Sequence, residues 1–299
     1  MKSIVMTGGT AGIGLAAAER MRQAPDVRLL VGARGQAPSG VESRPLDLGR
    51  LASVRGFADA VGAWLGEGAT IDALVLNAGI QAHDLAQRTE DGFETTFAVN
   101  HLAHYLLLRQ LAPRMADGAI VVITTSNLHD PSTNPIAAPV HADAEKLARG
   151  QVTLSPGARD RMAVMRAYAA SKLCNVLTAR ALASSGLALE RGLRITAFNP
   201  GFTPGTRLTL NHSLAFRGVF ALVAPILGVF QRQNTAAGGG SLLADLALGS
   251  IVPPAGKLYA SQVRRELTWP APSDLAHDDA VMAKLWRDSA AMVGLPVAE

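Results

Sequence analysis

The chain has 299 residues and a formal net charge of +4, with 48% hydrophobic and 17% charged residues. This composition excludes a disordered chain and supplies enough apolar side chains for a large α/β domain. The Lys and Arg residues form no basic stripe, so nucleic-acid binding is not expected. The one cysteine, Cys174, excludes an intramolecular disulfide and fits a reducing cytoplasm.

Short apolar runs alternate with longer helical stretches along the chain. Runs rich in Val, Ile and Leu predict strands at 2–7, 27–33, 71–76, 119–125 and 193–198, with a weaker run near 41–46. Stretches rich in Ala and Leu predict helices at 13–24, 51–65, 98–115 and 160–185. Because the strands are apolar on both faces, the pattern predicts a doubly wound parallel sheet with helices on both sides. Since no repeat or low-complexity linker interrupts it, we expect residues 1–299 to form a single domain.

Two long segments interrupt this alternation, and each follows a strand. Residues 127–158 are rich in polar residues and Pro, and residues 202–234 contain the longest apolar stretch, 214–230. That stretch is shorter than the ~20 residues of a membrane-spanning helix. No integral membrane span is therefore expected; a core helix or a helix over a pocket is favoured over an interfacial helix. Loops at the carboxyl edge of a parallel sheet are where ligands bind, so we expect both segments to cover a substrate.

The stretch TGGTAGIG, residues 7–14, joins the first predicted strand to the first helix. Backbone N–H groups and the helix dipole favour an anion at such a position, and glycines let the backbone approach a pyrophosphate. The spacing differs from the common fingerprint G-x-G-x-x-G. By itself, a tight turn without a ligand also explains these glycines. Glycines 238–240, in contrast, are expected to loosen the start of a helix rather than bind a second phosphate.

Five further motifs follow in chain order. LVLNAG ends a strand at Asn77–Gly79, FAVNHLAHYLLL places Asn100 in a helix, IVVITTS ends a strand near Ser126, YAASK contains Tyr168 and Lys172, and FNPGF places Pro200–Gly201 after a strand. Together they resemble the short-chain dehydrogenase/reductase family over roughly residues 2–260. VGARG, LDLGRLASVRGFA and YAASKLCNVLT are similar to its subgroup of retinol dehydrogenases and light-dependent protochlorophyllide reductases. The resemblance does not identify a substrate.

The resemblance implies a Rossmann-type fold that binds a nicotinamide dinucleotide. In it, we expect Gly8 to make the turn, Gly12 to approach the pyrophosphate and Gly14 to allow helix–strand packing. Thr7 is expected to brace the turn by hydrogen bonding, and Gly9 has no expected role. The expected cofactor-binding residues are Gly8, Thr10, Gly12, Ile13, Gly14, Arg34, Asp47, Leu48, Asn77, Ala78, Gly79, Tyr168, Lys172, Pro200, Gly201 and Thr203.

The end of the second predicted strand bears on which nicotinamide cofactor binds. Ala33 stands where a carboxylate would bond the 2′-hydroxyl of NAD, and no acidic residue lies between 27 and 41. The guanidinium of Arg34 can pair with a 2′-phosphate, which favours NADP(H) over the alternative that Arg34 is an ordinary exposed arginine. By resemblance Asp47 meets the adenine ring; an N-cap for the helix near Leu51 is the alternative.

Tyr168 and Lys172 lie four residues apart and share one helix face. The ordinary pKa of a phenol, ~10, is too high for efficient proton exchange at neutral pH, and a nearby ammonium lowers it. We expect Tyr168 to exchange a proton with substrate and the Ser126 hydroxyl to polarise a carbonyl, with Thr125 as the alternative donor. The resemblance implies that Asn100 holds a water linking Lys172 to solvent.

These residues predict an NADP(H)-dependent oxidoreductase that interconverts a carbonyl and an alcohol on a hydrophobic small molecule. The alternatives are reduction of a carbon–carbon double bond, in which Tyr168 would protonate carbon, and a non-catalytic NADP-binding regulator. We expect Cys174 to be a buried small hydrophobe, His101 and His104 to serve in packing or capping, and no metal site. A cytoplasmic monomer or homodimer is expected, because the segment before Tyr168 could obstruct the helix pairing that is frequent in the family.

Overall fold

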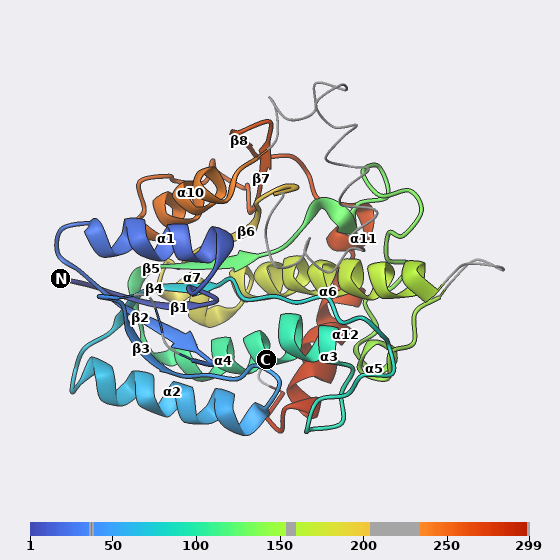
Figure 1. Ribbon diagram of the computed structural model, residues 1–299, viewed down its shortest axis with the longest axis horizontal. Coiled ribbons are helices and arrows are strands. Elements are labelled where there is room, and N and C mark those ends of the chain that lie inside the picture. The colour runs from blue at the N-terminus through green and yellow to red at the C-terminus, as the bar shows by residue number, and fades with distance from the viewer. Residues whose placement is uncertain (36, 38, 154–159, 204–233, 298–299) are drawn as a thin grey trace.

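A central parallel sheet organises the chain. The computed structural model describes residues 1–35, 37, 39–153, 160–203 and 234–297 (Figure 1). Within them, eight strands pair in the order β3-β2-β1-β4-β5-β6-β7-β8, and β7 and β8 form an antiparallel hairpin. Their bounds are β1 (Lys2–Thr7), β2 (Val27–Ala33), β3 (Glu42–Pro45), β4 (Ile71–Leu76), β5 (Met115–Thr124), β6 (Arg194–Asn199), β7 (Tyr259–Val263) and β8 (Glu266–Thr268). The predicted doubly wound sheet is confirmed.

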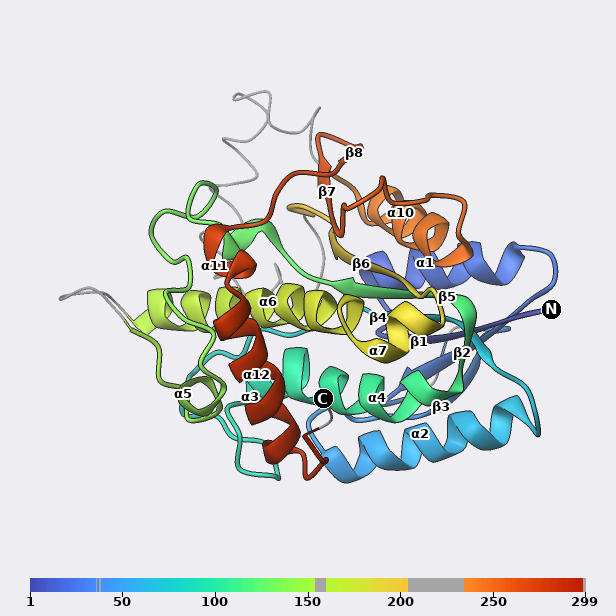
Figure 2. The same cartoon turned by 180° about the vertical axis from the view of Figure 1, so that it is seen from behind.

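Helices cover both faces of the sheet (Figures 1 and 2). On one side lie α1 (Gly12–Gln23) and α10 (Ala236–Leu248), and on the other α2 (Leu51–Leu65), α4 (Ala103–Leu111) and α6 (Asp160–Ala183). Successive strand residues point to opposite faces, so Ile4 and Met6 pack beneath α1 whereas Val5 packs on the other side. Burial on both faces explains why the strands are continuous apolar runs.

Short helices connect these elements. They are α3 (Thr95–Phe97), η1 (Ala98–Leu102), η2 (Ala112–Arg114), η3 (Asn127–His129), α5 (Ala144–Ala148), α7 (Gly186–Glu190), α11 (Asp274–His277) and the longer α12 (Asp279–Met292). The helix predicted at 98–115 is therefore divided into η1, a π-helical turn, then α4 and η2. Pro113 limits the helix at its end. The next strand starts at Met115 rather than 119, because Met115 already pairs with Ile71 of β4.

Glycines 238–240 lie in the first turns of α10, which is capped by Thr235. A Cβ at Gly240 would lie 2.5 Å from Ala16 Cβ and 2.7 Å from the Ile13 carbonyl oxygen, both in α1. The three glycines do lie at a helix start, as predicted, and Gly240 has a packing role that the sequence did not reveal. Gly240 lets α10 approach α1 more closely than a side chain would allow.

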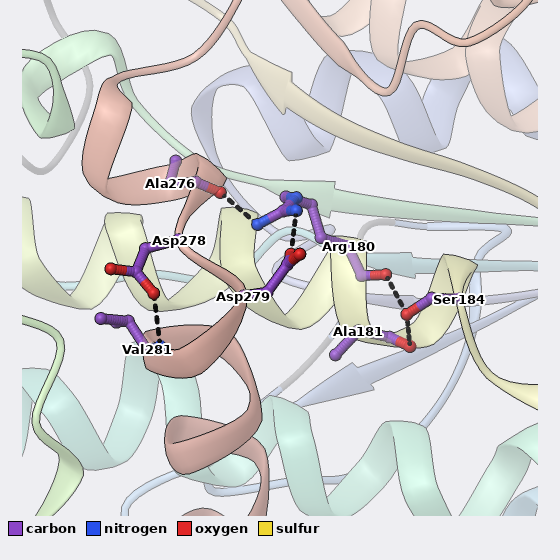
Figure 3. Close-up of polar contacts among 7 residues, drawn as sticks. All are labelled: Arg180, Ala181, Ser184, Ala276, Asp278, Asp279 and Val281. Atoms are coloured by element: carbon purple, nitrogen blue, oxygen red, sulfur yellow. Dashed lines mark hydrogen bonds and ion pairs between the residues drawn. The ribbon is translucent and has the colours of Figure 1, made fainter.

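The C-terminal helix α12 lies across α4 and α6, a cover that the sequence did not predict (Figure 2). Tyr105 of α4 donates its hydroxyl hydrogen bond to the Trp286 carbonyl at 2.9 Å. The Arg180 guanidinium of α6 donates to the Ala276 carbonyl and to the Asp279 carboxylate, both at 2.7 Å (Figure 3). The C-terminal segment thus covers α4 and α6, and α5 packs against α6 as well.

We expect the contacts of Arg180 to differ in strength. Arg180→Ala should lower the free energy of unfolding by about 1–3 kcal/mol, because it removes a charge-assisted bond to a backbone carbonyl. Asp279→Asn should cost less than about 1 kcal/mol, since the Asp279 side chain is 80% exposed. Urea unfolding of both variants measures the difference. Equal losses would contradict the Ala276 carbonyl as the main anchor.

The apolar stretch 214–230 lies outside the described residues. In the described part of the chain, no helix is both long and apolar enough to cross a membrane. The same residues contain no group of three or more His, Cys, Asp or Glu side chains placed to hold a metal ion. Of the predicted excursion at 127–158, residues 127–153 are described, and they include η3 and α5.

Candidate active site

A cleft of about 560 Å³ opens at the carboxyl ends of the central strands. Its lining includes every residue expected to bind the cofactor, from Gly8 to Thr203, together with Thr125 and Ser126. Asn100 does not line the cleft and is completely buried beside it. Residues from the ends of six strands, β1 to β6, therefore line one cleft, as expected for a doubly wound sheet.

The glycine turn is packed so closely that side chains are excluded. Gly8 has a φ of +72°, and a Cβ there would lie 2.7 Å from both the Cα and the N of Ala78. A Cβ at Gly14 would lie 1.8 Å from the Gly8 carbonyl oxygen, so Gly14 packs the helix against the turn itself. Gly12 also has a positive φ, +56°, and lines the cleft. These glycines form a cradle that fits the phosphates of a dinucleotide.

Gly9 has a packing role that the sequence did not reveal. A Cβ at this position would lie 3.0 Å from both Cγ atoms of Val31 in β2. The absence of a side chain therefore lets the turn lie against the neighbouring strand. The signal was invisible in the sequence because Val31 is distant along the chain.

Thr7 connects the glycine turn to the end of β4 and to α4. Its hydroxyl oxygen accepts the N–H groups of Asn77 (3.0 Å) and Ala78 (3.1 Å), and lies 2.9 Å from His104 Nε2. His104 Nδ1 lies 3.1 Å from the Asn100 carbonyl oxygen. A carbonyl can only accept, so Nδ1 carries the proton and the Thr7 hydroxyl donates to Nε2. His104 thus links the turn to Asn100.

The His104 ring is held in its neutral form by its surroundings. Its pKa is lowered to about 4, chiefly by burial and to a smaller extent by the charge of Lys172, against the opposing effect of the bond to the Asn100 carbonyl. A neutral ring is the form that both of its contacts require. The predicted packing role is therefore incomplete, because His104 also joins two parts of the site.

Asn100 lies in the π-helical turn η1, a type of turn frequent at functional sites. Its side chain accepts the Ile80 N–H at 2.8 Å and donates to the Ile80 carbonyl at 2.9 Å. It also donates to the Ser171 hydroxyl at 3.0 Å. A Cβ at Gly79 would lie 3.2 Å from Lys172 Nζ and 3.4 Å from Asn100 Oδ1, so these groups border the same space.

Tyr168 and Lys172 are buried on the inner face of α6. Lys172 Nζ donates to the Thr124 carbonyl at 3.2 Å and lies 5.7 Å from the centre of the Tyr168 ring. Burial raises the pKa of Tyr168 to about 12 and lowers the pKa of Lys172 to about 8. The predicted lowering of the phenol pKa by the ammonium is therefore wrong for this structure, because desolvation dominates. At neutral pH the phenol keeps its proton and Lys172 remains mostly charged.

The two hydroxyl groups that follow β5, those of Thr125 and Ser126, have different hydrogen-bond partners. Thr125 is buried, and its hydroxyl donates to the Lys172 carbonyl at 2.7 Å. Ser126 is half-buried, and its oxygen accepts the Leu128 N–H at 3.3 Å. Within the described residues the Ser126 hydroxyl donates to no acceptor, so its proton is available to the cleft. The geometry favours Ser126 over Thr125 as the donor to a ligand.

Arg34 follows β2 and Asp47 follows β3, the two strands at one edge of the sheet. Arg34 is exposed on the cleft wall. Asp47 Oδ1 accepts the Gly49 N–H at 3.0 Å, whereas the N-cap residue of α2 is Arg50 and the Leu51 N–H bonds to Asp91. The alternative that Asp47 caps α2 is therefore wrong.

The turn after β6 is fixed by two asparagines. Asn199 Oδ1 accepts the Gly201 N–H at 3.0 Å. Asn234 donates to the Pro200 carbonyl at 3.1 Å and to the Gln262 carbonyl at 3.0 Å. Gly201 has a φ of +66°, and a Cβ there would lie 2.1 Å from Asn234 Nδ2, so only glycine fits. Sequence reasoning missed Asn234 because it lies more than thirty residues from its partner Pro200.

Apolar side chains line part of the same cleft. They include Leu128, Met165, Phe202 and Val99, with the polar Gln81. Met165 precedes Tyr168 by three residues, so helical spacing could have identified it. Cys174 is fully buried in the core and absent from the lining, and burial raises the pKa of its thiol. Its predicted role as a buried small hydrophobe is confirmed.

Comparison with known proteins identifies the family. The short chain dehydrogenase model matches residues 2–137. Mouse retinol dehydrogenase 13 is 31% identical over 313 residues, covering 99% of this chain and 85% of that protein. The chain belongs to the short-chain dehydrogenase family. Among its relatives, protochlorophyllide reductase A from rice is 30% identical over 243 residues, 73% of this chain and 62% of that protein. The predicted family and subgroup are confirmed.

Some relatives are considerably longer than this short-chain dehydrogenase. A WW domain-containing oxidoreductase from Drosophila melanogaster is 29% identical over 246 residues, 77% of this chain but 56% of that protein. This chain therefore spans little more than half of that relative. The crystal structure of an uncharacterized protein from Mycobacterium paratuberculosis is similar with a TM-score of 0.70 and 25% identity, covering 100% of this chain and 96% of that one.

Proposed function

We propose that the protein is an NADP(H)-dependent oxidoreductase that interconverts a carbonyl and an alcohol on a hydrophobic small molecule. One observation carries this proposal. Tyr168, Lys172 and Ser126 line one cleft, and the glycine turn and Arg34 line the same cleft. We further propose that residues 1–299 act as one NADP-binding unit, as a monomer or homodimer in the cytoplasm.

We assign a separate role to each of the proposed catalytic residues, which are Asn100, Ser126, Tyr168 and Lys172. When bound, NADPH supplies the hydride. The Ser126 hydroxyl donates a hydrogen bond to the substrate oxygen as negative charge develops there. Tyr168 transfers its phenolic proton to that oxygen, and Lys172, held by the Thr124 carbonyl, keeps a positive charge beside the phenol. Asn100 fixes the loop after β4 through its two bonds to Ile80. Its further proposed role is to hold the water that resupplies the proton.

The protonation state of Tyr168 suits the role of proton donor in carbonyl reduction. A group that donates a proton must hold it at the working pH. Burial raises the pKa of Tyr168 to about 12, so the phenol is protonated at neutral pH. The apolar side chains of Leu128, Met165 and Phe202 support a hydrophobic substrate.

Oxidation of NADPH with a panel of ketones, aldehydes and conjugated enones tests this proposal. We expect turnover with apolar ketones or aldehydes and recovery of the corresponding alcohols. Tight NADPH binding without turnover on the whole panel would support the non-catalytic regulator instead. Reduction of the double bond of enones would support the second enzyme candidate, which the similarity to rice protochlorophyllide reductase favours.

The choice of cofactor depends on Arg34. Arg34→Ser is expected to raise the Kd for NADPH at least about tenfold and leave that for NADH unchanged, because only NADPH carries the 2′-phosphate. Arg287→Ser, which removes an exposed arginine of α12, is the matched control and should change neither. Thermal-shift titrations with each cofactor measure both. Equal stabilisation of the unaltered protein by NADPH and NADH would refute the proposed role of Arg34.

A further inference from the structure

His129 lies in η3, three residues after Ser126, and is 1% exposed. Its Nδ1 lies 2.6 Å from the Ser126 carbonyl oxygen, and its Nε2 lies 3.3 Å from the backbone nitrogen of Ser273. The carbonyl can only accept and the amide can only donate. Both contacts therefore require the same neutral tautomer, protonated on Nδ1. Burial lowers the pKa of His129, which favours this neutral form.

The ring of His129 is also fixed by packing. It contacts Tyr259 of β7 edge-to-face, with ring centres 5.2 Å apart and planes at 82°. The segment that leads into α11 lies beside the segment that follows β5 in both views (Figures 1 and 2). His129 thus joins the end of β5 to β7 and to the C-terminal segment.

Ser126 needs such a restraint because it lies beyond the sheet. β5 ends at Thr124, and the last backbone bond to β6 is donated by Thr125 to the Phe198 carbonyl at 2.8 Å. The Ser126 side chain itself has a long contact, 3.3 Å, with the Leu128 N–H. A donor that polarises a reacting carbonyl must be held within a fraction of an ångström, since displacements near 1 Å cost about a hundredfold in rate.

We propose that His129 is a positioning residue for Ser126. It fixes the Ser126 carbonyl through Nδ1–H, while Ser273 and Tyr259 hold the ring in the orientation that this bond requires. The C-terminal segment around Ser273 is thereby part of the support of the active site. This inference rests on the proposed function, which assigns Ser126 as the hydrogen-bond donor to the substrate.

Two substitutions of His129 distinguish positioning from packing. His129→Asn places an amide N–H where Nδ1 stands and can keep the bond to Ser126, whereas His129→Gln places its amide nearer the position of Nε2. We expect His129→Gln to lower kcat at least about tenfold and His129→Asn to stay within about threefold, with the Kd for NADPH unchanged in both. A packing role predicts the reverse order, because Asn leaves the larger cavity. That reverse order would overturn the inference.

A double-mutant cycle with Ser126→Ala completes the test. If His129 acts through Ser126, His129→Gln should lower kcat little further once the serine hydroxyl is gone. Additive losses would overturn the inference alone. A Ser126→Ala variant with full kcat would overturn the proposed role of Ser126 and this inference with it. His141→Gln, which changes a histidine of the same segment outside the cleft lining, is the control and should retain full kcat.

Discussion

Replacing Tyr168 by phenylalanine is expected to lower kcat about a thousandfold and leave NADPH binding intact. A positioned proton donor contributes about 10²–10⁴-fold to such a reaction. Tyr168 is 9% exposed, and the substitution keeps the buried ring in place. It removes only the phenolic proton, which burial holds on the oxygen at neutral pH. Single-turnover oxidation of NADPH measures the rate, and thermal shift measures binding.

Tyr105→Phe is the matched control for this variant. Tyr105 lies in α4, and its hydroxyl donates to the Trp286 carbonyl of α12 at 2.9 Å, away from the cleft lining. Its loss should lower the free energy of unfolding by about 1 kcal/mol without changing kcat. A Tyr168→Phe variant that retains more than a tenth of the unaltered kcat would show that another group donates the proton.

The second large effect is expected from Gly14→Ala. The added Cβ would lie 1.8 Å from the Gly8 carbonyl oxygen and 2.6 Å from Asn77 Nδ2. The Gly8 carbonyl oxygen is part of the backbone of the turn, so relieving this contact requires the turn itself to move. Because the turn presents its N–H groups to the phosphates in the proposed complex, the Kd for NADPH should rise about a hundredfold or more. Isothermal titration calorimetry measures this constant.

Gly56→Ala provides the control for this substitution. Gly56 lies in the middle of α2, is exposed, and a Cβ there would meet nothing within 4 Å. The change should stabilise the protein by about 0.5–1 kcal/mol and leave the Kd for NADPH unchanged. If Gly14→Ala binds NADPH as tightly as Gly56→Ala, the turn does not hold the phosphates.

Some elements were predictable because their signal is local. The buried strands β1, β2, β4 and β6 are continuous apolar runs, and their predicted bounds agree with the structure within one residue. The start of β5 was missed because Asp117 and Gly118 are exposed and interrupt the apolar pattern. The β7–β8 hairpin was missed because Arg264 and Arg265 occupy positive φ values of 49° and 73°, without the Asn-Gly signal typical of such turns.

In the candidate site, too, some features have a local signal in the sequence and others depend on contacts between distant residues. The four-residue spacing of Tyr168 and Lys172 is a property of one helix, so their common face follows from the chain alone. Distinguishing Ser126 from Thr125 required the structure, because the Thr125 hydroxyl donates its proton to the carbonyl of Lys172, 47 residues away. The structure was also needed to exclude Asp47 as the N-cap of α2, because the Leu51 N–H bonds to Asp91, a residue of a distant loop.

The motifs and their order, by themselves, determined the family, the sheet and most of the cleft lining. Local spacing and apolar periodicity are properties of residues that are close together in the sequence, so they can be recognised without knowing how the chain packs. The elevated pKa of Tyr168 and the neutral state of His104 follow from burial, which exists only after distant segments have packed together. Thr7 meets His104 across 97 residues and His129 meets Ser273 across 144. Contacts at such separations arise from the complete fold, and so they emerge only from the three-dimensional structure.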